Sequence, residues 1–357
     1  MTFLEDLFIS DVDLGIGLQF ENCKFSKKII LVNSQANGYD NNFSKDSVSL
    51  HFSKCVFEEQ VIIKGPNTVF DRSINFDECH LKMGLFLENI SIATESIYLK
   101  RSVIEKHFDI RRVEIKQGLT LSSTTVEAKA RLENVFCHTI ALLDSIFKED
   151  LQVWAGYLQH GFTINNGEYH EDVKLMSTES PGSLFILGAI FHNSVIVTYQ
   201  DKAAKISRGF RQIHLVEAEY RNGLYISGKA DLFSEPAVLE KLVIRISPKL
   251  NGELVFRQLN ITECHLEGYN STANLVFEDL WIQRIKISNF INQSMLIFSG
   301  LKGRPYPITE QSGGENTNTI SITSSNFGKA QFYRVDFESF DKILIHDTIV
   351  SEISTSN

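Results

Sequence analysis

Residues 18–25 read LQFENCKF, and the same arrangement returns as LHFSKCVF at residues 50–57 and as INFDECHL at residues 74–81. A fourth copy, LNITECHL, occupies residues 259–266. In each copy, two alternating apolar residues precede two polar residues, a cysteine, one further residue and a large apolar residue. This internal repeat is the feature of the chain that predicts its fold.

The series extends along the chain when another small residue replaces the cysteine. Such copies end at Phe147, Tyr169, Phe191 and Tyr220, and three more run consecutively within residues 325–337. Phe147, Tyr169 and Phe191 follow one another at intervals of 22 residues. A repeat of this period is typical of a solenoid, in which each repeat packs mainly on its neighbours.

The alternation covers only a few residues in each copy, which is typical of short strands rather than helices. Strands this short cannot bury a face alone, but they can if the chain coils and each turn stacks on the previous one. With about 22 residues per turn, we expect roughly 16 turns spaced about 4.8 Å apart. The side chains of Phe25, Phe57, Phe147 and Tyr169 are predicted to point inward.

We predict one continuous solenoid over residues 1–357. Four insertions are expected near residues 33–47, 199–211, 227–248 and 300–319, where Asn, Gly, Pro or spaced basic residues interrupt the alternation. Two short helices are expected within them, at residues 201–208 and 236–242. Insertions in a solenoid gather on one face, and that face is often the binding face.

The small-x-aromatic pentads resemble the pentapeptide-repeat family. The resemblance rests on the pairs Cys23/Phe25, Cys55/Phe57, Cys79/Leu81 and Cys264/Leu266, together with residues 325–337. It implies a single-stranded right-handed parallel β-helix, hence an all-β chain, with short helical or loop insertions. Because strict pentads are rarely consecutive here, we expect a less regular coil than the four-sided coil of that family.

The looser relatives that this resemblance suggests are bacterial proteins in which such a solenoid precedes a helical or membrane segment. The resemblance therefore implies the soluble sensor part of a larger membrane-associated or defence protein.

Charge and cysteine content narrow the possible functions. The 35 Lys and Arg against 44 Asp and Glu give a net charge of −9, so the basic surplus needed to bind a nucleic-acid backbone is missing. The five cysteines form no CxxC pair and lie in apolar segments, which indicates reduced, buried thiols and a cytoplasmic location. No apolar stretch approaches the ~20 residues of a membrane-spanning helix, and the first residues lack the positive charge of a secretory signal.

The sequence predicts a non-catalytic scaffold or recognition module that binds a protein or another ligand, with no cofactor. No motif of a nucleophile elbow, a phosphate-binding loop or a zinc site is present, so we predict no catalytic or metal-binding residue. Arg and Tyr are enriched in interface hot spots, which directs attention to the 300–319 insertion and to the basic run near residue 205. The candidate binding residues are Lys302, Arg304, Tyr306, Lys202, Lys205, Arg208 and Arg211.

The sequence also allows two other functions and a dimer. Some pentapeptide-repeat proteins imitate duplex DNA and block topoisomerases, and the net negative charge permits this. A β-helix enzyme acting on polysaccharides would need outward carboxylates and basic residues on one face, which Glu114 with Lys116, and Arg111 with Arg112, could supply. A homodimer through an uncapped solenoid end is a further expectation.

Overall fold

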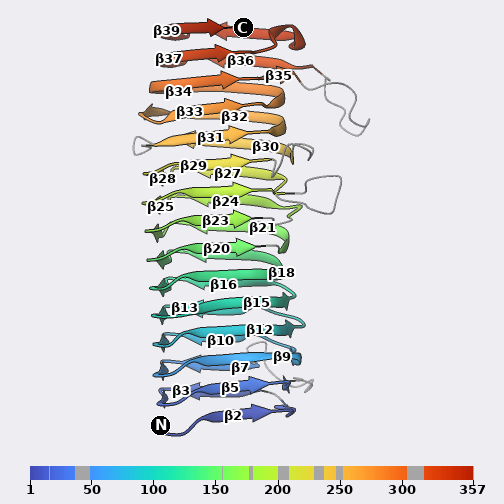
Figure 1. Ribbon diagram of the computed structural model, residues 1–357, viewed down its shortest axis with the longest axis vertical. Coiled ribbons are helices and arrows are strands. Elements are labelled where there is room, and N and C mark those ends of the chain that lie inside the picture. The colour runs from blue at the N-terminus through green and yellow to red at the C-terminus, as the bar shows by residue number, and fades with distance from the viewer. Residues whose placement is uncertain are drawn as a thin grey trace. The chain divides into compact units, whose positions relative to one another are not determined.

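The computed structural model describes residues 1–15, 17–36, 49–154, 156–176, 180–199, 209–228, 237–246, 252–303 and 317–356. Strands make up 68% of the chain and helix 1%, and the parallel strands stack into a β-solenoid of about 14 turns (Figure 1). The chain divides into two compact units, residues 1–182 (unit 1) and residues 183–357 (unit 2). The all-β parallel solenoid is therefore confirmed, whereas its right-handedness stays a prediction.

The solenoid has fewer turns than the roughly 16 expected, because several turns are longer than about 22 residues. Phe25 is in register with Phe57, which lies 32 residues later, and Phe191 is in register with Tyr220, which lies 29 residues later.

A turn of unit 1 contains three strands of different length, such as β10 (Ile74–Asp77), β11 (His80–Leu81) and β12 (Leu85–Ile92). Each pairs in parallel with its equivalent in the next turn, namely β13 (Ile97–Lys100), β14 (Val103–Ile104) and β15 (Phe108–Ile115). The other strands of unit 1 are β1 (Thr2–Phe3), β2 (Leu7–Ser10), β3 (Leu18–Glu21), β4 (Lys24–Phe25), β5 (Ile29–Val32), β6 (Gln35–Ala36), β7 (Leu50–Ser53), β8 (Val56–Phe57), β9 (Val61–Phe70), β16 (Gly118–Ser122), β17 (Thr125–Val126), β18 (Ala130–Leu143), β19 (Ile146–Phe147), β20 (Leu151–Trp154), β21 (Tyr157–Asn165), β22 (Glu168–Tyr169) and β23 (Val173–Met176).

Unit 2 begins on the same plan and then changes. Its first described turns are β24 (Ser183–Leu187), β25 (Ile190–Phe191) and β26 (Val195–Thr198), followed by β27 (Gln212–Val216), β28 (Glu219–Tyr220) and β29 (Leu224–Ser227). In the described residues, the sheet that the two-residue strands form ends at β28, and longer strands follow in the later turns. These elements are β30 (Ala237–Ile246), β31 (Glu253–Arg257), β32 (Leu259–Ser271), β33 (Asn274–Glu278), β34 (Trp281–Ser299), β35 (Lys302–Gly303), β36 (Thr319–Thr323), β37 (Asn326–Tyr333), the 3₁₀ helix η1 (Phe337–Ser339), β38 (Lys342–His346) and β39 (Ile349–Ser356).

The repeated small residue is explained by the geometry of one corner in unit 1. The residue before it has a left-handed backbone, as at Glu78 and Arg101, with φ of 52° and 48°. The small side chain that follows donates to carbonyl oxygens at the corner and so adds hydrogen bonds to those of the backbone. The Ser102 hydroxyl donates to Lys100 O at 2.9 Å within its own turn and to Phe76 O at 3.3 Å in the preceding turn. The Cys79 thiol likewise donates to Phe52 O at 3.3 Å.

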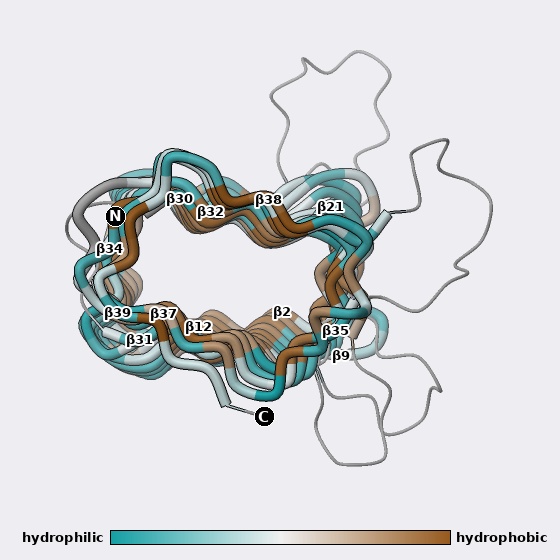
Figure 2. The backbone as a smooth tube through the Cα atoms, turned by 90° about the horizontal axis from the view of Figure 1, so that it is seen from above, coloured by the Kyte–Doolittle hydropathy of each residue, from teal (hydrophilic) through white to brown (hydrophobic). Residues whose placement is uncertain are grey.

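The aromatic residues of the repeat form stacked rows inside the coil, where the hydrophobic positions of the tube face inward (Figure 2). The rings of Phe25 and Phe57 stack with centroids 5.1 Å apart, and those of Phe147 and Tyr169 stack at 5.3 Å. All four side chains are at most 1% exposed, which confirms the predicted inward positions. All five cysteines are free and buried, as expected.

One sequence expectation was wrong, and the last pentad differs from the others. Residues 237–242, expected to be helical, belong to strand β30, because parallel pairing with β27 and β32 imposes an extended backbone. Of the C-terminal pentads, Phe327 is buried, but Phe337 is 41% exposed because it lies in η1 and so leaves the strand alternation. The expected helix at 201–208, and the central parts of all four insertions (37–48, 200–208, 229–236 with 247–251, and 304–316), lie outside the described residues.

Candidate ligand-binding groove

The predicted binding residues are only partly described. Lys302 of β35 is exposed and pairs in register with Trp281 of β34. Arg211 forms an ion pair with Glu240. Nothing in the described part of the chain brings Lys302 and Arg211 into one site. Arg304, Tyr306, Lys202, Lys205 and Arg208 lie outside the described residues, so their binding role stays a prediction.

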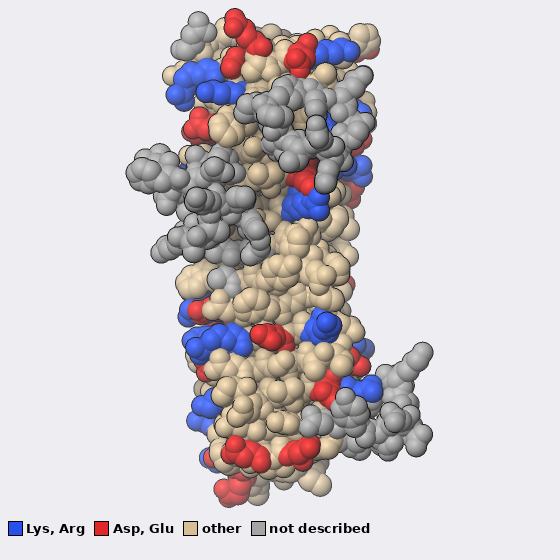
Figure 3. Space-filling model, turned by 90° about the vertical axis from the view of Figure 1, so that its right-hand side faces the viewer, with Lys and Arg blue, Asp and Glu red and all other residues tan. Residues whose placement is uncertain are grey.

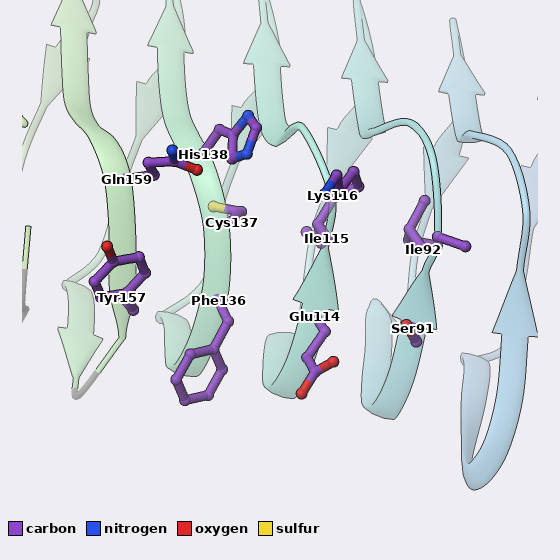
Figure 4. A pocket seen from close by; sticks show the side chains of 11 residues that line it. Ser91, Ile92, Glu114, Ile115, Lys116, Phe136, Cys137, His138, Tyr157 and Gln159 are labelled. Carbon is purple, nitrogen blue, oxygen red and sulfur yellow. The ribbon is translucent and has the colours of Figure 1, made fainter.

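A groove of about 320 Å³ lies instead on the outer surface of unit 1, and four successive turns contribute to it (Figure 4). Two rows of outward side chains form its walls. We call them the aromatic row, which contains Phe136 and Tyr157, and the polar row, which contains Lys116, His138 and Gln159. The groove is lined by Ser91, Ile92, Ala93, Glu114, Ile115, Lys116, Phe136, Cys137, His138, Tyr157 and Gln159.

The register of the strands builds the aromatic row. Ser91 of β12 pairs with Glu114 of β15, Glu114 pairs with Phe136 of β18, and Phe136 pairs with Tyr157 of β21. Side chains at paired positions of parallel strands point in the same direction, so these four side chains follow one another across the turns. The row is therefore a consequence of the solenoid and needs no separate loop to hold it.

The furrow between the rows arises from strand alternation. Ile115 and Cys137 each come one residue after an aromatic-row residue and one before a polar-row residue, and both are buried. Because their side chains point inward, the backbone between the two rows has nothing projecting over it. The polar row is held by the corner, where the Lys116 N–H donates to Ile92 O at 3.0 Å and the His138 N–H donates to Gln117 O at 2.8 Å.

Two large rings are exposed in the aromatic row. Phe136 is 46% and Tyr157 is 39% exposed, although both come from strands whose inward residues are almost fully buried. Across the furrow, the ring of His138 packs edge-on against that of His160, with centroids 5.0 Å apart. The groove thus has two exposed aromatic rings on one side, in the same row as Ser91 and Glu114, and a row of hydrogen-bonding groups on the other.

The groove is lined by one acidic and one basic side chain, Glu114 and Lys116. Glu114 and Lys116 are both exposed, and no ion pair of either is found among the described residues. The adjacent arginines differ, because Arg111 pairs with Asp109 at 2.6 Å and Arg112 pairs with Glu88. Two pairs of charged residues were singled out in the sequence. Glu114 and Lys116 both line the groove, whereas Arg111 and Arg112 form ion pairs with Asp109 and Glu88.

Cys137 forms part of the floor and is not a nucleophile in this setting. Burial raises the pKa of its thiol to about 12, which keeps it protonated at neutral pH. Its Sγ lies 3.4 Å from Thr139 O.

Several other histidines are not among the residues that line the groove. His80 is within 2.5 Å of Glu105, and His170 is 3.6 Å from Glu168. His51, His80 and His265 are each partly exposed.

Sequence reasoning missed Phe136, His138, Tyr157 and Gln159. A usable signal existed, since Phe136 and Tyr157 are 21 residues apart and each precedes an inward apolar residue. Two outward aromatic residues separated by one turn predict an exposed pair of rings.

Comparisons with known proteins give no relative. No protein-family model, no curated protein and no solved structure matches this chain. In the described residues there is no helix with the length and apolar character needed to cross a membrane.

Proposed function

We propose that this protein is a non-catalytic recognition module that binds an extended ligand along the groove of unit 1. The observation that carries the proposal is the exposed pair Phe136 and Tyr157, aligned on adjacent strands and facing a row of polar side chains. Large aromatic rings on a protein surface are typical of binding sites, because their exposure is unfavourable until a ligand covers them.

The scaffold suits recognition because it holds the binding groups in place. Phe136 belongs to the 14-residue strand β18 and Tyr157 to β21, and the two strands pair from Phe136 and Tyr157 to Leu143 and Asn165. Side chains on paired strands are positioned more accurately than side chains on long loops. A ligand can therefore bind here with little ordering cost to the protein.

The groove supports binding better than catalysis. Hydrolysis of a glycosidic bond ordinarily uses two carboxyl groups roughly 5–10 Å apart, whereas Glu114 is the one carboxylate among the residues that line the groove. The protonated Cys137 thiol offers no nucleophile. A polysaccharide-active enzyme stays the alternative, since Glu114 and Lys116 do share this surface.

The charge arrangement does not favour the DNA-mimic alternative. Many carboxylates of unit 1 are paired with bases across turns, as in Glu58 with Lys24 at 3.0 Å and with Lys82 at 2.7 Å. On the face drawn in Figure 3, charged side chains form small groups of both signs, not one extended acidic surface. A polyanion mimic needs its negative charge unneutralised.

The remaining expectations belong to the same proposal. We propose that the protein is similar to pentapeptide-repeat proteins, that it comes from a bacterium and that it is cytoplasmic. We also propose that it is the sensor part of a larger membrane-associated or defence protein. A homodimer through one end of the solenoid is also part of this proposal, and Ile349 of β39 is the residue chosen to test it. Substituting Ile349 by Lys is expected to reduce any dimer seen by analytical ultracentrifugation.

Titration of the full chain with candidate ligands tests the binding function directly. Methyl groups of Ile92 and Ile115, labelled with ¹³C, report on the groove floor by NMR. We expect an extended ligand to shift these two signals, and the Phe136→Ala/Tyr157→Ala double variant to abolish the shift. The matched control is Phe185→Ala, which removes a 43% exposed ring of unit 2 and leaves the groove intact.

A further inference from the structure

We infer that the ligand of this groove is an uncharged, extended polysaccharide that lies across the strands, with one sugar ring on each turn. This inference rests on the proposed function, because it names the chemical class that the same groove binds. Three properties of the groove support it: its repeat distance, its aromatic wall and its charge balance.

The repeat distance favours sugar rings. The aromatic row places one side chain on each of four successive turns, and neighbouring parallel strands are about 4.8 Å apart. An extended chain of six-membered sugar rings advances by about the same distance per ring. An extended peptide presents side chains on one face only every second residue, at about 6.6–6.8 Å, and so falls out of step with the turns.

The two walls match the two kinds of surface on a sugar ring. The C–H groups of a pyranose form an apolar face that packs on an aromatic ring, which Phe136 and Tyr157 provide on consecutive turns. The hydroxyl groups project from the edge of the ring and need hydrogen-bond partners. Lys116, His138 and Gln159 supply donors and acceptors along the opposite wall, one on each turn.

The charge balance points to a neutral chain. The groove lining contains one carboxylate, Glu114, and one ammonium group, Lys116, on the same turn. A polyuronate or a nucleic acid brings a negative charge with every unit and would meet Glu114 without a basic surplus to offset it. A hydroxyl can instead donate to Glu114 and accept from Lys116, and both hydrogen bonds are stronger for being made to charged groups.

Isothermal titration of the full chain with β-1,4-linked glucose, mannose, xylose and N-acetylglucosamine oligomers of two to six units tests the inference. We expect at least one series to bind, with affinity rising up to four rings and then levelling off, because the aromatic row spans four turns. Phe136→Ala and Tyr157→Ala should each weaken binding by about tenfold or more. Phe185→Ala should leave it unchanged.

Hexagalacturonate and an extended hexapeptide are the comparison probes, and the methyl signals of Ile92 and Ile115 locate binding. If either of these probes shifts the signals and no neutral oligomer does, the sugar inference is overturned while the groove remains a binding site. If no probe shifts them, the proposed function fails as well. Shortening of a bound oligomer, seen by chromatography, would overturn the assignment as non-catalytic.

Discussion

Cys79 and Cys264 occupy the same place in two segments that share five of eight residues, INFDECHL and LNITECHL, yet their backbone settings differ between the two units. In unit 1, Cys79 follows Glu78, whose φ is 52°, and its thiol donates to Phe52 O at the corner. In unit 2, Cys264 lies within the continuous strand β32, in register with Leu242 and Ile285. The same pattern thus marks a corner in one unit and an inward strand position in the other.

The different backbone settings of Cys79 and Cys264 show which structural feature the repeat determines. Both cysteines are buried, at 2% and 0% exposure, so the pattern fixes the inward direction of the side chain in either setting. Whether the chain turns there depends on the residue before it adopting the left-handed conformation, which few non-glycine residues do without support from the surrounding turns. The cross-section of the coil is therefore decided by stacking on neighbouring turns rather than by the repeat alone.

The largest effect is expected from removing one stacked ring in each unit. Phe57→Ala in unit 1 and Phe277→Ala in unit 2 should each lower the free energy of unfolding by about 3–5 kcal/mol, because each ring is buried and packs against at least two other aromatic rings. Hydrogen exchange followed by mass spectrometry should show the loss of protection mainly in the unit that carries the substitution. An equal loss across both units would contradict their separate compactness, and Phe185→Ala serves as the exposed control.

The two cysteines offer a finer test of the comparison. Cys79→Ser should change the free energy of unfolding by less than about 1 kcal/mol, because Ser102 and Ser145 already fill the same corner with similar hydrogen bonds. Cys264→Ser should cost about 1–3 kcal/mol, because apolar neighbours surround its inward position and the hydroxyl would have to be buried among them. Urea unfolding measures both, and equal costs would show that the two settings do not differ as described.

The inward rows were predictable because they depend on alternation within a few residues. Phe25, Phe57, Phe147 and Tyr169 could be placed from such local patterns, without knowing the length of any turn. Strand β30 was not predictable in this way, since Ala237, Leu239, Glu240 and Lys241 favour helices locally and only pairing with β27 and β32 makes them extended.

The groove required information that the local pattern does not contain. Glu114 and Lys116 could be recognised as outward residues of one strand. Their alignment with Phe136 and Tyr157 depends on turns of 22 and 21 residues, which set which positions lie side by side. Long-range register, rather than residue type, decided the composition of the site.

The smallest effects should appear in the response of the two units to acid. In unit 2, partial burial, with a contribution from Lys241, lowers the pKa of His214 below its ordinary value of 6.5, and burial lowers that of His265 in the same direction. In unit 1, hydrogen bonds from Lys82 and Lys24 lower the pKa of Glu58 below its ordinary value of 4.5. The unfolded chain therefore binds protons more readily than the native protein at all three groups, and stability falls as the pH falls through each range.

The two units should consequently weaken in different pH ranges. Unit 2 should begin to lose stability below about pH 6.5, where an unfolded histidine takes up its proton, and unit 1 should lose the Glu58 contribution only below about pH 4.5. Hydrogen exchange at pH 7, 5.5 and 4 can separate the two ranges, with the His214→Gln/His265→Gln variant as the control that should lose the first step. If unit 2 of this variant still loses protection between pH 7 and pH 5.5, groups other than His214 and His265 cause the loss, and the prediction is wrong.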